Sequence, residues 1–489
     1  MCAKTDQELM INLQPQILWS YFYKITQIPR PSKKEGKITE FLVGFADNHQ
    51  LDYTVDKTGN LLIRKSGTKG MEDHPTVILQ AHMDMVCEKN ADVVHNFDTD
   101  PIQSYIDGDW VKAKGTTLGA DNGIGVAMML AVLESNDIPH PPLECLFTVD
   151  EETGLGGAYG LDSNMLTGAY LINLDSEDDG EIFIGCAGGI GTKAFYSYKE
   201  DKCPAGYLRF NISVSGFSGG HSGGDIHLGK ANAIKVLNRY LWQVNQEVDM
   251  RLISISGGNL HNAIPREASA SFAIPQQEKE KIRVMLNVFI SSIEDEYSDI
   301  EPNFRIKLES DSSEASTISK EDTVKILNML YALPHGVIGM SRDMPDLVET
   351  STNLASIKML PNNQIEINTS QRSSAESLKV DIAAQIKSVF KLAGTEVKQT
   401  DGYPGWKPNL KSELLKKADI AYKNLFGIEP NKKAIHAGLE CGLFLSKYPH
   451  LDMISIGPQM HGVHSPDERL SIKSTQKSWE WLKEILKNC

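Results

Sequence analysis

The chain has 489 residues, enough for two or three domains with buried cores. Its formal net charge of −15 and pI near 5.4 argue against nucleic acids and anionic membranes as partners, because both bind positively charged surfaces. Residues 1–8 lack the apolar segment of a secretory signal and no apolar stretch reaches the ~20 residues of a membrane-spanning helix, so we expect a cytoplasmic protein.

An apolar stretch at residues 77–85 ends with a histidine and an aspartate two positions apart, His82 and Asp84. Residues i and i+2 of a strand point the same way, so both side chains can share one face where the strand leaves the core. This arrangement suits a metal ligand and a carboxylate that orients it. Alone it is weak evidence, because an ordinary strand end at the surface has the same pattern.

A glycine-rich loop at 115–125 leads into an apolar run at 126–133 that is typical of a buried helix. Asp121 would therefore lie at the N-terminus of that helix, where an anion is favoured and a ligand is held firmly. The sequence of this loop therefore predicts that the Asp121 carboxylate is held rigidly.

Acidic residues also follow the next two predicted strands. The strand at 143–149 is followed by adjacent carboxylates that include Glu151 and Glu152, and the strand at 169–174 is followed by Asp175. Each carboxylate alone could belong to a solvated loop. Together they fit one crevice at the carboxyl ends of the strands of an open α/β sheet, where such sheets bind ligands.

The last segment of this kind carries two histidines. A predicted strand at 453–456 is followed by His461 and His464, and His464 directly precedes the sequence Ser-Pro-Asp-Glu. The same crevice can accommodate either imidazole, so the residues alone leave the choice between them open.

The pattern of strands changes near residue 187. Before it, apolar strands alternate with helical stretches, as in a mostly parallel sheet, and this pattern resumes after about 403. Between these points, alternating strands such as 208–214 indicate an antiparallel sheet with one wet face. Further strands are expected at 251–256, 268–273, 304–308 and 364–368, with helices around 229–245 and 277–296. We therefore predict one domain from 1–186 and 404–489, and an inserted α+β domain at 187–403.

These motifs closely resemble, in order and over essentially the whole chain, the aminoacylhistidine dipeptidases, also called peptidase D or Xaa-His dipeptidases, of the two-zinc exopeptidase family. The resemblance rests on residues 82–84, 119–123, 150–154, Asp175 and 464–468, with 436–442 similar to the dipeptidase branch. It implies an α/β fold with an open mixed sheet and helices on both faces as the catalytic domain. The inserted domain would be an α+β lid with an antiparallel sheet. A cis peptide bond after Asp121 is also implied.

Two divalent ions held roughly 3.5–4 Å apart need a bridging carboxylate and about two further protein ligands each. Asp121, rigid at a helix start, is the natural bridge. The resemblance implies His82 and Asp175 at one ion and Glu152 and His464 at the other, and it favours His464 over His461 because of the Ser-Pro-Asp-Glu sequence. Zn²⁺ is the expected metal, with Co²⁺ or Mn²⁺ as alternatives, because such ligands discriminate weakly between these ions.

Two acidic residues remain for catalysis. Asp84 is expected to orient His82 by accepting its second N–H. Glu151 lies beside the ligand Glu152 but points elsewhere at the strand tip, so we predict that it is the general base. It would take a proton from the attacking water and pass it to the leaving amine.

Five further residues are expected to bind the substrate: His221, Asn262, Arg372, His436 and Glu440. In the resembling enzymes a histidine in the context of His221 lies near the tetrahedral oxyanion, after lid closure or from a second subunit. Arg372 offers a bidentate fork for a free α-carboxylate. A turn amide for Asn262 and a surface charge for Arg372 stay open as alternatives.

These observations predict an exopeptidase that hydrolyses dipeptides, preferably with C-terminal histidine as in β-alanyl-histidine. A tripeptidase, carboxypeptidase or aminoacylase with the same two-metal site is the alternative. A non-catalytic metal-binding protein is a third hypothesis, but metal binding alone needs no base such as Glu151. The expected partner is a small peptide, and a homodimer through the lid is an expectation of the resemblance.

Overall fold

The computed structural model describes residues 9–312 and 315–489, so the segment 1–8 that argued against a secretory signal lies outside them. The chain divides into two compact units. Unit 1 comprises the described residues of Met1–Gly185, Pro408–Ala434 and Leu439–Cys489, and unit 2 comprises Cys186–Lys407 and Ile435–Gly438. The segment Ile435–Gly438 thus belongs with the inserted residues, whereas the sequence placed it in the other domain. Among the described residues, no helix is both long and apolar enough to cross a membrane.

Unit 1 is built on an eight-stranded sheet with the order β1-β2-β6-β3-β7-β23-β8-β22. Its strands are β1 (Asp52–Val55), β2 (Leu61–Lys65), β6 (Leu143–Thr148), β3 (Val77–His82), β7 (Tyr170–Asn173), β23 (Asp452–Ser455), β8 (Glu181–Cys186) and β22 (Asn431–Ile435). The four central strands β6, β3, β7 and β23 pair in parallel, whereas β1 with β2, β2 with β6 and β8 with β23 pair antiparallel. This is the mixed sheet that the family resemblance implied.

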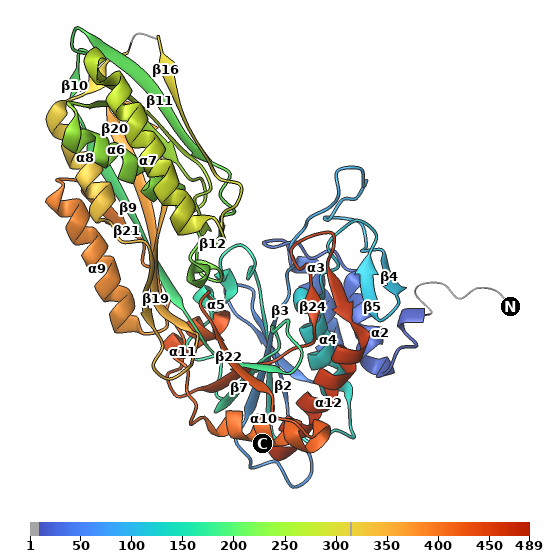
Figure 1. Ribbon diagram of the computed structural model, residues 1–489. Helices are drawn as coiled ribbons and strands as arrows, with labels where there is room; N and C mark the ends of the chain where they lie inside the picture. Colours follow the sequence, from blue (N-terminus) through green and yellow to red (C-terminus); the bar gives the residue numbers. More distant parts are fainter. Residues whose placement is uncertain (1–8, 313–314) are drawn as a thin grey trace. The chain divides into compact units, whose positions relative to one another are not determined.

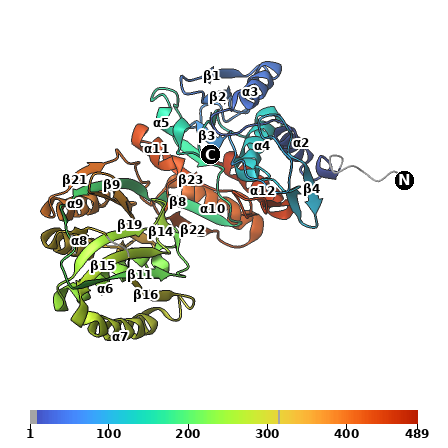
Figure 2. The ribbon, with the colours of Figure 1, turned by 90° about the horizontal axis from the view of Figure 1, so that it is seen from above.

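Helices cover both faces of this sheet. They are α2 (Gln16–Thr26), α3 (Gly36–Asn48), α4 (Ala120–Glu134), α5 (Gly156–Gly160), α10 (Glu413–Phe426), α11 (Glu440–Lys447) and α12 (Ile472–Asn488). Figure 2 shows α5 and α11 on one side of the central strands and α4 and α12 on the other. Every residue of β3 is buried, and α4 is buried along nearly its whole length, as expected for elements at the centre of a layered α/β unit.

A smaller four-stranded sheet completes unit 1, in the order β24-β25-β5-β4. Its strands are β4 (Ser104–Asp107), β5 (Trp110–Ala113), β24 (Met460–His461) and β25 (Arg469–Ser471). The loop between β24 and β25 carries the Ser-Pro-Asp-Glu motif, so this sheet anchors His464 on both sides.

Unit 2 contains a nine-stranded antiparallel sheet with the order β16-β11-β15-β13-β19-β20-β9-β21, in which β18 also pairs with β19. Its strands are β9 (Gly188–Ser197), β11 (Tyr207–Ser215), β13 (Arg251–Gly257), β15 (Ala268–Pro275), β16 (Arg305–Asp311), β18 (Gly336–Met340), β19 (Val348–Leu360), β20 (Gln364–Ser373) and β21 (Glu396–Gln399). The predicted antiparallel sheet of the insertion is therefore confirmed. Two short pairs lie outside it: β10 (Glu200–Asp201) with β17 (Thr317–Ile318), and β12 (Gly220–His221) with β14 (Ala263–Ile264).

Four helices lie along one side of this sheet (Figure 1), namely α6 (Ala233–Glu247), α7 (Lys279–Tyr297), α8 (Lys320–Ala332) and α9 (Glu376–Leu392). The alternation in β11 buries Phe210, Ile212 and Val214, which join one core cluster with apolar residues of these helices such as Leu237 and Phe289. Burial of this apolar face against the helices gives unit 2 a core of its own.

The parallel strands of unit 1 determine where its polar side chains gather. In the register of the sheet His82, the last residue of β3, is opposite Thr148, the last residue of β6. Glu151 and Glu152 follow β6, which pairs with β3 on one side, and Asp175 follows β7, which pairs with β3 on the other side. The residues that come after these strands therefore meet at one edge of the sheet.

Candidate functional site

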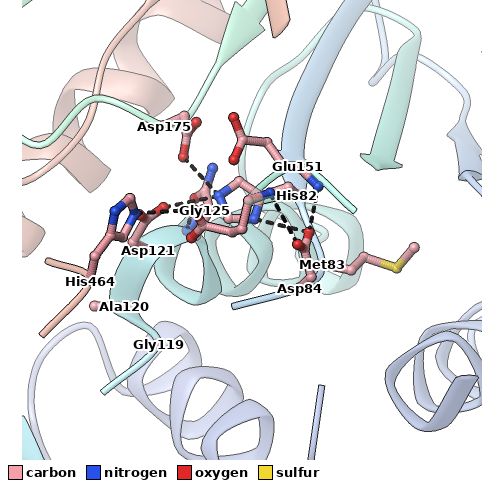
Figure 3. Close-up of polar contacts among 12 residues, drawn as sticks. His82, Met83, Asp84, Gly119, Ala120, Asp121, Gly125, Glu151, Asp175 and His464 are labelled. Atoms are coloured by element: carbon pink, nitrogen blue, oxygen red, sulfur yellow. Dashed lines mark hydrogen bonds and ion pairs between the residues drawn. The ribbon is translucent and has the colours of Figure 1, made fainter. Parts of the chain in front are cut away.

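Two histidines face one aspartate at this edge of the sheet (Figure 3). His82 Nε2 lies 2.9 Å from Asp121 Oδ1 and 3.4 Å from Asp175 Oδ1. His464 Nε2 lies 3.0 Å from Asp121 Oδ2 and 3.1 Å from Glu152 Oε2. Each carboxylate oxygen of Asp121 thus faces a different imidazole, the arrangement expected of a carboxylate shared between two metal ions.

The backbone around Asp121 is shaped by its neighbours. The peptide bond between Asp121 and Asn122 is cis, as the sequence resemblance implied. The Asn122 side-chain oxygen accepts a hydrogen bond from the Gly125 backbone N–H at 3.2 Å. A Cβ on Gly125 would lie 2.2 Å from that oxygen and 2.9 Å from the Leu174 carbonyl oxygen, so the close approach of α4 to the sheet requires glycine here.

Asp84 is fully buried and holds the strand tip that carries Glu151 and Glu152. Its carboxylate accepts hydrogen bonds from the backbone N–H groups of Glu151 at 3.1 Å and Glu152 at 3.2 Å, and from Ser32 Oγ at 2.7 Å. Its Oδ1 lies 3.4 Å from His82 Nδ1, longer than the hydrogen bond predicted from the sequence. Burial alone would raise the pKa of Asp84, but the His82 imidazole and these donors hold it below its usual value.

The titratable side chains of this cluster are buried close together, and their pKa values are shifted. Burial raises the pKa of Glu151 well above its usual value and that of Asp175 to about 6. Hydrogen bonds to Asp121 and Glu152 raise the pKa of His464 to about 11. Carboxylates that are buried together repel one another, so positive charge placed among them is strongly favoured.

The donor set fits metal ions. Three overlapping groups each have ligand atoms within 4.8 Å of one another: His82, Asp121 and Asp175; Asp121, Glu152 and His464; His82, Glu151 and Glu152. In the described part of the chain, Glu152 Oε1 and Asp175 Oδ1 are buried without a hydrogen-bond partner. Imidazole nitrogens and carboxylate oxygens are ordinary zinc ligands, so these residues can hold divalent cations.

A second polar cluster lies within unit 2, on β19 and β20. Ser351 and Arg372 are cross-strand partners. Ser351 Oγ lies 2.7 Å from His436 Nε2, and Arg372 Nη1 donates a hydrogen bond to the Tyr403 hydroxyl at 2.6 Å. In the described part of unit 2, Arg372 Nε and His436 Nδ1 are buried without a hydrogen-bond partner. The guanidinium group of Arg372 is thus only partly satisfied within unit 2.

His221 joins this cluster through the loop that follows β12. A Cβ on Gly223 would lie 2.2 Å from the His436 carbonyl oxygen, 3.1 Å from His221 Cε1 and 3.3 Å from Arg372 Nε, so the three residues converge around Gly223. His221 Nδ1 accepts hydrogen bonds from the backbone N–H groups of Gly223 at 3.3 Å and Gly224 at 2.9 Å. The proton of the neutral ring is therefore on Nε2, which can act as a donor.

The chain that carries this site matches a known peptidase family. Residues 78–488 match the model of Peptidase family M20/M25/M40. The chain belongs to this peptidase family. It is 44% identical to the cytosol non-specific dipeptidase of Escherichia coli (strain K12) over 475 residues, which are 97% of this chain and 98% of that relative.

Solved structures agree with this membership. The aminoacylhistidine dipeptidase from Vibrio alginolyticus has a TM-score of 0.93 and 42% identity, with 98% of each chain covered. A tripeptidase from Staphylococcus aureus has a TM-score of 0.55 at 17% identity, covering 97% of this chain and 98% of that one, which supports the fold alone.

In this M20/M25/M40 peptidase, the five residues predicted as metal ligands come together in unit 1. His461, the alternative to His464, instead lies against Trp110, with ring centroids 5.3 Å apart. Four of the residues predicted to bind substrate, His221, Asn262, Arg372 and His436, belong to unit 2. Asn262 is next to β14, and its carbonyl oxygen accepts a hydrogen bond from the Ser222 N–H at 2.8 Å.

Glu440, the fifth of these residues, lies in unit 1 below the strand ends. Its carboxylate accepts hydrogen bonds from Gln80 Nε2 at 2.6 Å and Thr148 Oγ1 at 3.1 Å. It is 2% exposed, and burial raises its pKa to about 8. Glu440, the first residue of α11, therefore binds side chains of both β3 and β6, and its partner Thr148 is opposite His82 in the register of the sheet.

Sequence reasoning missed two charged residues that contact the Asp121 loop. Glu468 belongs to the Ser-Pro-Asp-Glu motif but had no role assigned, and Arg30 was not singled out at all. Each is 2% exposed. A buried charge almost always has a partner, but a sequence does not say which Glu or Arg will be buried.

The two histidines of the β24–β25 segment form a matched pair for testing the metal centre. Replacing His464 by alanine removes an imidazole that faces Asp121 and Glu152, so we expect at least about a tenfold weaker affinity for Zn²⁺. His461→Ala removes only a ring contact with Trp110 and should leave the affinity unchanged. Competition with a chromophoric chelator measures both values. Equal affinities in the two variants would remove His464 from the ligand set.

Proposed function

We propose that this peptidase hydrolyses dipeptides in a two-metal centre, with C-terminal histidine dipeptides as its preferred substrates. The observation that carries the proposal is Asp121, whose two carboxylate oxygens lie 2.9 Å and 3.0 Å from the imidazoles of His82 and His464. The relatives described as a cytosol non-specific dipeptidase and an aminoacylhistidine dipeptidase support dipeptides as the substrate class.

In this proposal Asp121 would help to hold two divalent ions, Zn²⁺ in the first place and Co²⁺ or Mn²⁺ as alternatives. His82 and Asp175 would be the further ligands of one ion, and Glu152 and His464 those of the other. Such ions, when bound, polarise the scissile carbonyl and make water more acidic. Asp84 binds the backbone N–H groups of Glu151 and Glu152 and lies 3.4 Å from the His82 ring, so we assign it as a positioning group.

Glu151 is proposed as the general base. Its backbone N–H is bound to Asp84, while Figure 3 has its carboxyl group turned toward Asp175 and away from Asp84. This fixed backbone and free carboxyl group suit a side chain that must accept a proton from water and pass it to the leaving amine nitrogen. Burial favours the protonated form of Glu151, which helps the second of these transfers.

The cluster in unit 2 is proposed to recognise the substrate. The Nε2 proton of His221 suits a carbonyl oxygen that becomes negative in the transition state. Arg372 has a buried guanidinium with an unsatisfied Nε, which suits a free α-carboxylate. Burial and the charge of Arg372 lower the pKa of His436 to about 3, so this ring is neutral and can hydrogen-bond a neutral group of the substrate. Asn262 and Glu440 are assigned to substrate binding from the sequence resemblance.

A broader dipeptidase specificity is the second candidate, because one relative of 44% identity is described as non-specific. The same relative supports a cytoplasmic location. Assembly into a homodimer through unit 2 stays a prediction of the sequence resemblance.

A panel of peptides tests the proposed function directly. The purified enzyme should release histidine from β-alanyl-histidine and other Xaa-His dipeptides faster than it hydrolyses Xaa-Gly or Xaa-Ala dipeptides. N-acetylated amino acids and tripeptides should be poor substrates. Removal of metal with a chelator should abolish turnover, and Zn²⁺, Co²⁺ or Mn²⁺ should restore it. Hydrolysis that persists in the chelated, metal-free protein would contradict the proposal, and equal rates across dipeptides would favour the broader specificity.

Replacement of Glu151 by glutamine keeps the shape of the side chain and removes its basicity. We expect kcat to fall by at least ~10²-fold, because the attacking water loses its proton acceptor. Metal content and KM should change little, since Glu151 acts in the transition state. Asp150→Asn alters the neighbouring carboxylate at the same strand tip and serves as the control with near-parental kcat. Loss of metal from Glu151→Gln would instead make Glu151 a ligand.

His221→Ala tests the proposed oxyanion donor. We expect kcat to fall at least ~10²-fold, as for the loss of an oxyanion-hole donor. Metal content should be parental, because all metal-binding groups found among the described residues lie in unit 1. His261→Ala, an exposed histidine of the same unit, is the matched control. Equal turnover in the His221 and His261 variants would exclude a catalytic role for His221.

A further inference from the structure

Two buried, oppositely charged residues hold the loop of residues 118–121 from two sides. Glu468 accepts hydrogen bonds from its N–H groups, and Arg30 donates a hydrogen bond to one of its carbonyl groups. Neither residue belongs to the ligand set described above. Both contact the backbone that carries Asp121, the carboxylate on which the metal centre depends.

Glu468 serves as the cap of helix α4. Its Oε2 accepts hydrogen bonds from the N–H groups of Leu118 at 2.6 Å and Gly119 at 2.9 Å, and its Oε1 from Ala120 at 2.8 Å and Asp121 at 3.3 Å. Gly119, at the N-cap position, has no side chain to do this. The first N–H groups of a helix need partners from elsewhere, and here one carboxylate accepts from the first two residues of α4 and from the two residues before them.

Glu468 and His464 come from the same short loop between β24 and β25. His464 lies 3.0 Å from the Asp121 side chain, while Glu468 lies 3.3 Å from the Asp121 backbone N–H. One loop therefore contacts Asp121 at both its side chain and its backbone. This double contact fixes the position of the His464 imidazole relative to the Asp121 carboxylate.

Arg30 makes the corresponding link to β3. Its Nη1 donates hydrogen bonds to the carbonyl oxygens of Met83 at 2.9 Å and Asp84 at 2.6 Å, and its Nη2 donates one to the carbonyl oxygen of Gly119. A Cβ on Gly119 or on Gly123 would lie 2.6 Å or 2.7 Å from Nη2. These two glycines of the motif at 119–123 therefore leave the space that the guanidinium occupies.

The two contacts together connect the three segments that supply the shared carboxylate and its two imidazoles. Arg30 joins the end of β3, next to His82, to the Asp121 loop. Glu468 joins the same loop to the segment of His464. Burial of either charge is unfavourable unless the charged group is well hydrogen-bonded, so these side chains are held in one geometry by their partners.

We propose that Arg30 and Glu468 are positioning residues that set Asp121 at the distance from His82 and His464 that two metal ions require. This inference rests on the proposed two-metal function but is tested by metal binding rather than by hydrolysis. The role predicts weaker metal affinity on mutation, whereas a purely structural cap predicts only lower stability.

The chain contains a matched control for this distinction. Glu144 is also a buried glutamate of unit 1 that caps backbone, accepting hydrogen bonds from the N–H groups of Thr167 at 2.9 Å and Gly168 at 3.0 Å. It has no contact with the Asp121 loop among the hydrogen bonds of the described residues. Glu144→Gln therefore reproduces the loss of a buried carboxylate cap without touching the metal centre.

The experiment compares Glu468→Gln, Glu144→Gln and the parent protein. Zn²⁺ affinity is measured by competition with a chromophoric chelator, the visible absorption of the Co²⁺ form reports ligand geometry, and thermal unfolding of the metal-free protein reports stability. We expect both variants to unfold at lower temperature. Only Glu468→Gln should bind Zn²⁺ about 10–100-fold more weakly and alter the Co²⁺ spectrum.

Parental Zn²⁺ affinity and Co²⁺ spectrum in a folded Glu468→Gln protein would overturn the proposal, as would an equal loss in Glu144→Gln. Should Glu468→Gln fail to fold, Arg30→Lys decides the question, because lysine keeps the charge but loses the fork that joins Met83, Asp84 and Gly119. A parental affinity there would reject the role of positioning. If the parent binds two metals but hydrolyses no dipeptide, the proposed function fails while this inference stands on its own result.

Discussion

The Asp121 carboxylate is the constraint on which the rest of unit 1 depends. It is 9% exposed and lies within 3.0 Å of two imidazoles, with Glu152 and Asp175 close to the same rings. Taking several carboxylates out of water is expensive, and this cost is recovered only if strong positive charge and well-aligned donors are present. Among the described residues, Glu152 Oε1 and Asp175 Oδ1 are buried without a hydrogen-bond partner, so divalent cations are the natural source of the charge.

Two carboxylates that support the ligand set take their hydrogen bonds mainly from backbone N–H groups. Asp84 accepts hydrogen bonds from the N–H groups of Glu151 and Glu152, and Glu468 accepts them from residues 118–121 at the start of α4. Parallel strands make this possible, because their carboxyl ends lie side by side and leave N–H groups of the following loops unpaired. The ligands therefore lie at strand ends and in short loops that these hydrogen bonds hold in place, which is what a metal centre with fixed spacing needs.

Much of this could be predicted from the sequence, since the apolar strands at 77–82 and 143–148 and the acidic residues after them occur in order along the chain. Strands β9 and β19 were not predicted, because their glycine-, serine- and threonine-rich sequences lack clean alternation and are buried by long-range pairing. The segment Ile435–Gly438 groups with unit 2, which its position in the sequence does not indicate, because its hydrogen bonds to Ala187 join residues far apart in sequence. Arg30 was not singled out either, because its partners are backbone carbonyl groups of residues far along the chain, and no sequence motif indicates such contacts.

The two units differ in the charge that they bury, and this difference bears on how a dipeptide could be recognised. The ligand cluster of unit 1 buries carboxylates, which select cations. In the cluster around β19 and β20 of unit 2 the buried charge is Arg372, and burial together with this guanidinium lowers the pKa of both His221 and His436, which favours the neutral rings. A neutral imidazole can donate a hydrogen bond without adding charge, whereas an imidazolium would compete with Arg372 for the same anion. The cluster around Arg372 therefore combines one positive charge with neutral imidazoles, and in the proposed function this pattern suits a single terminal carboxylate better than a more highly charged ligand.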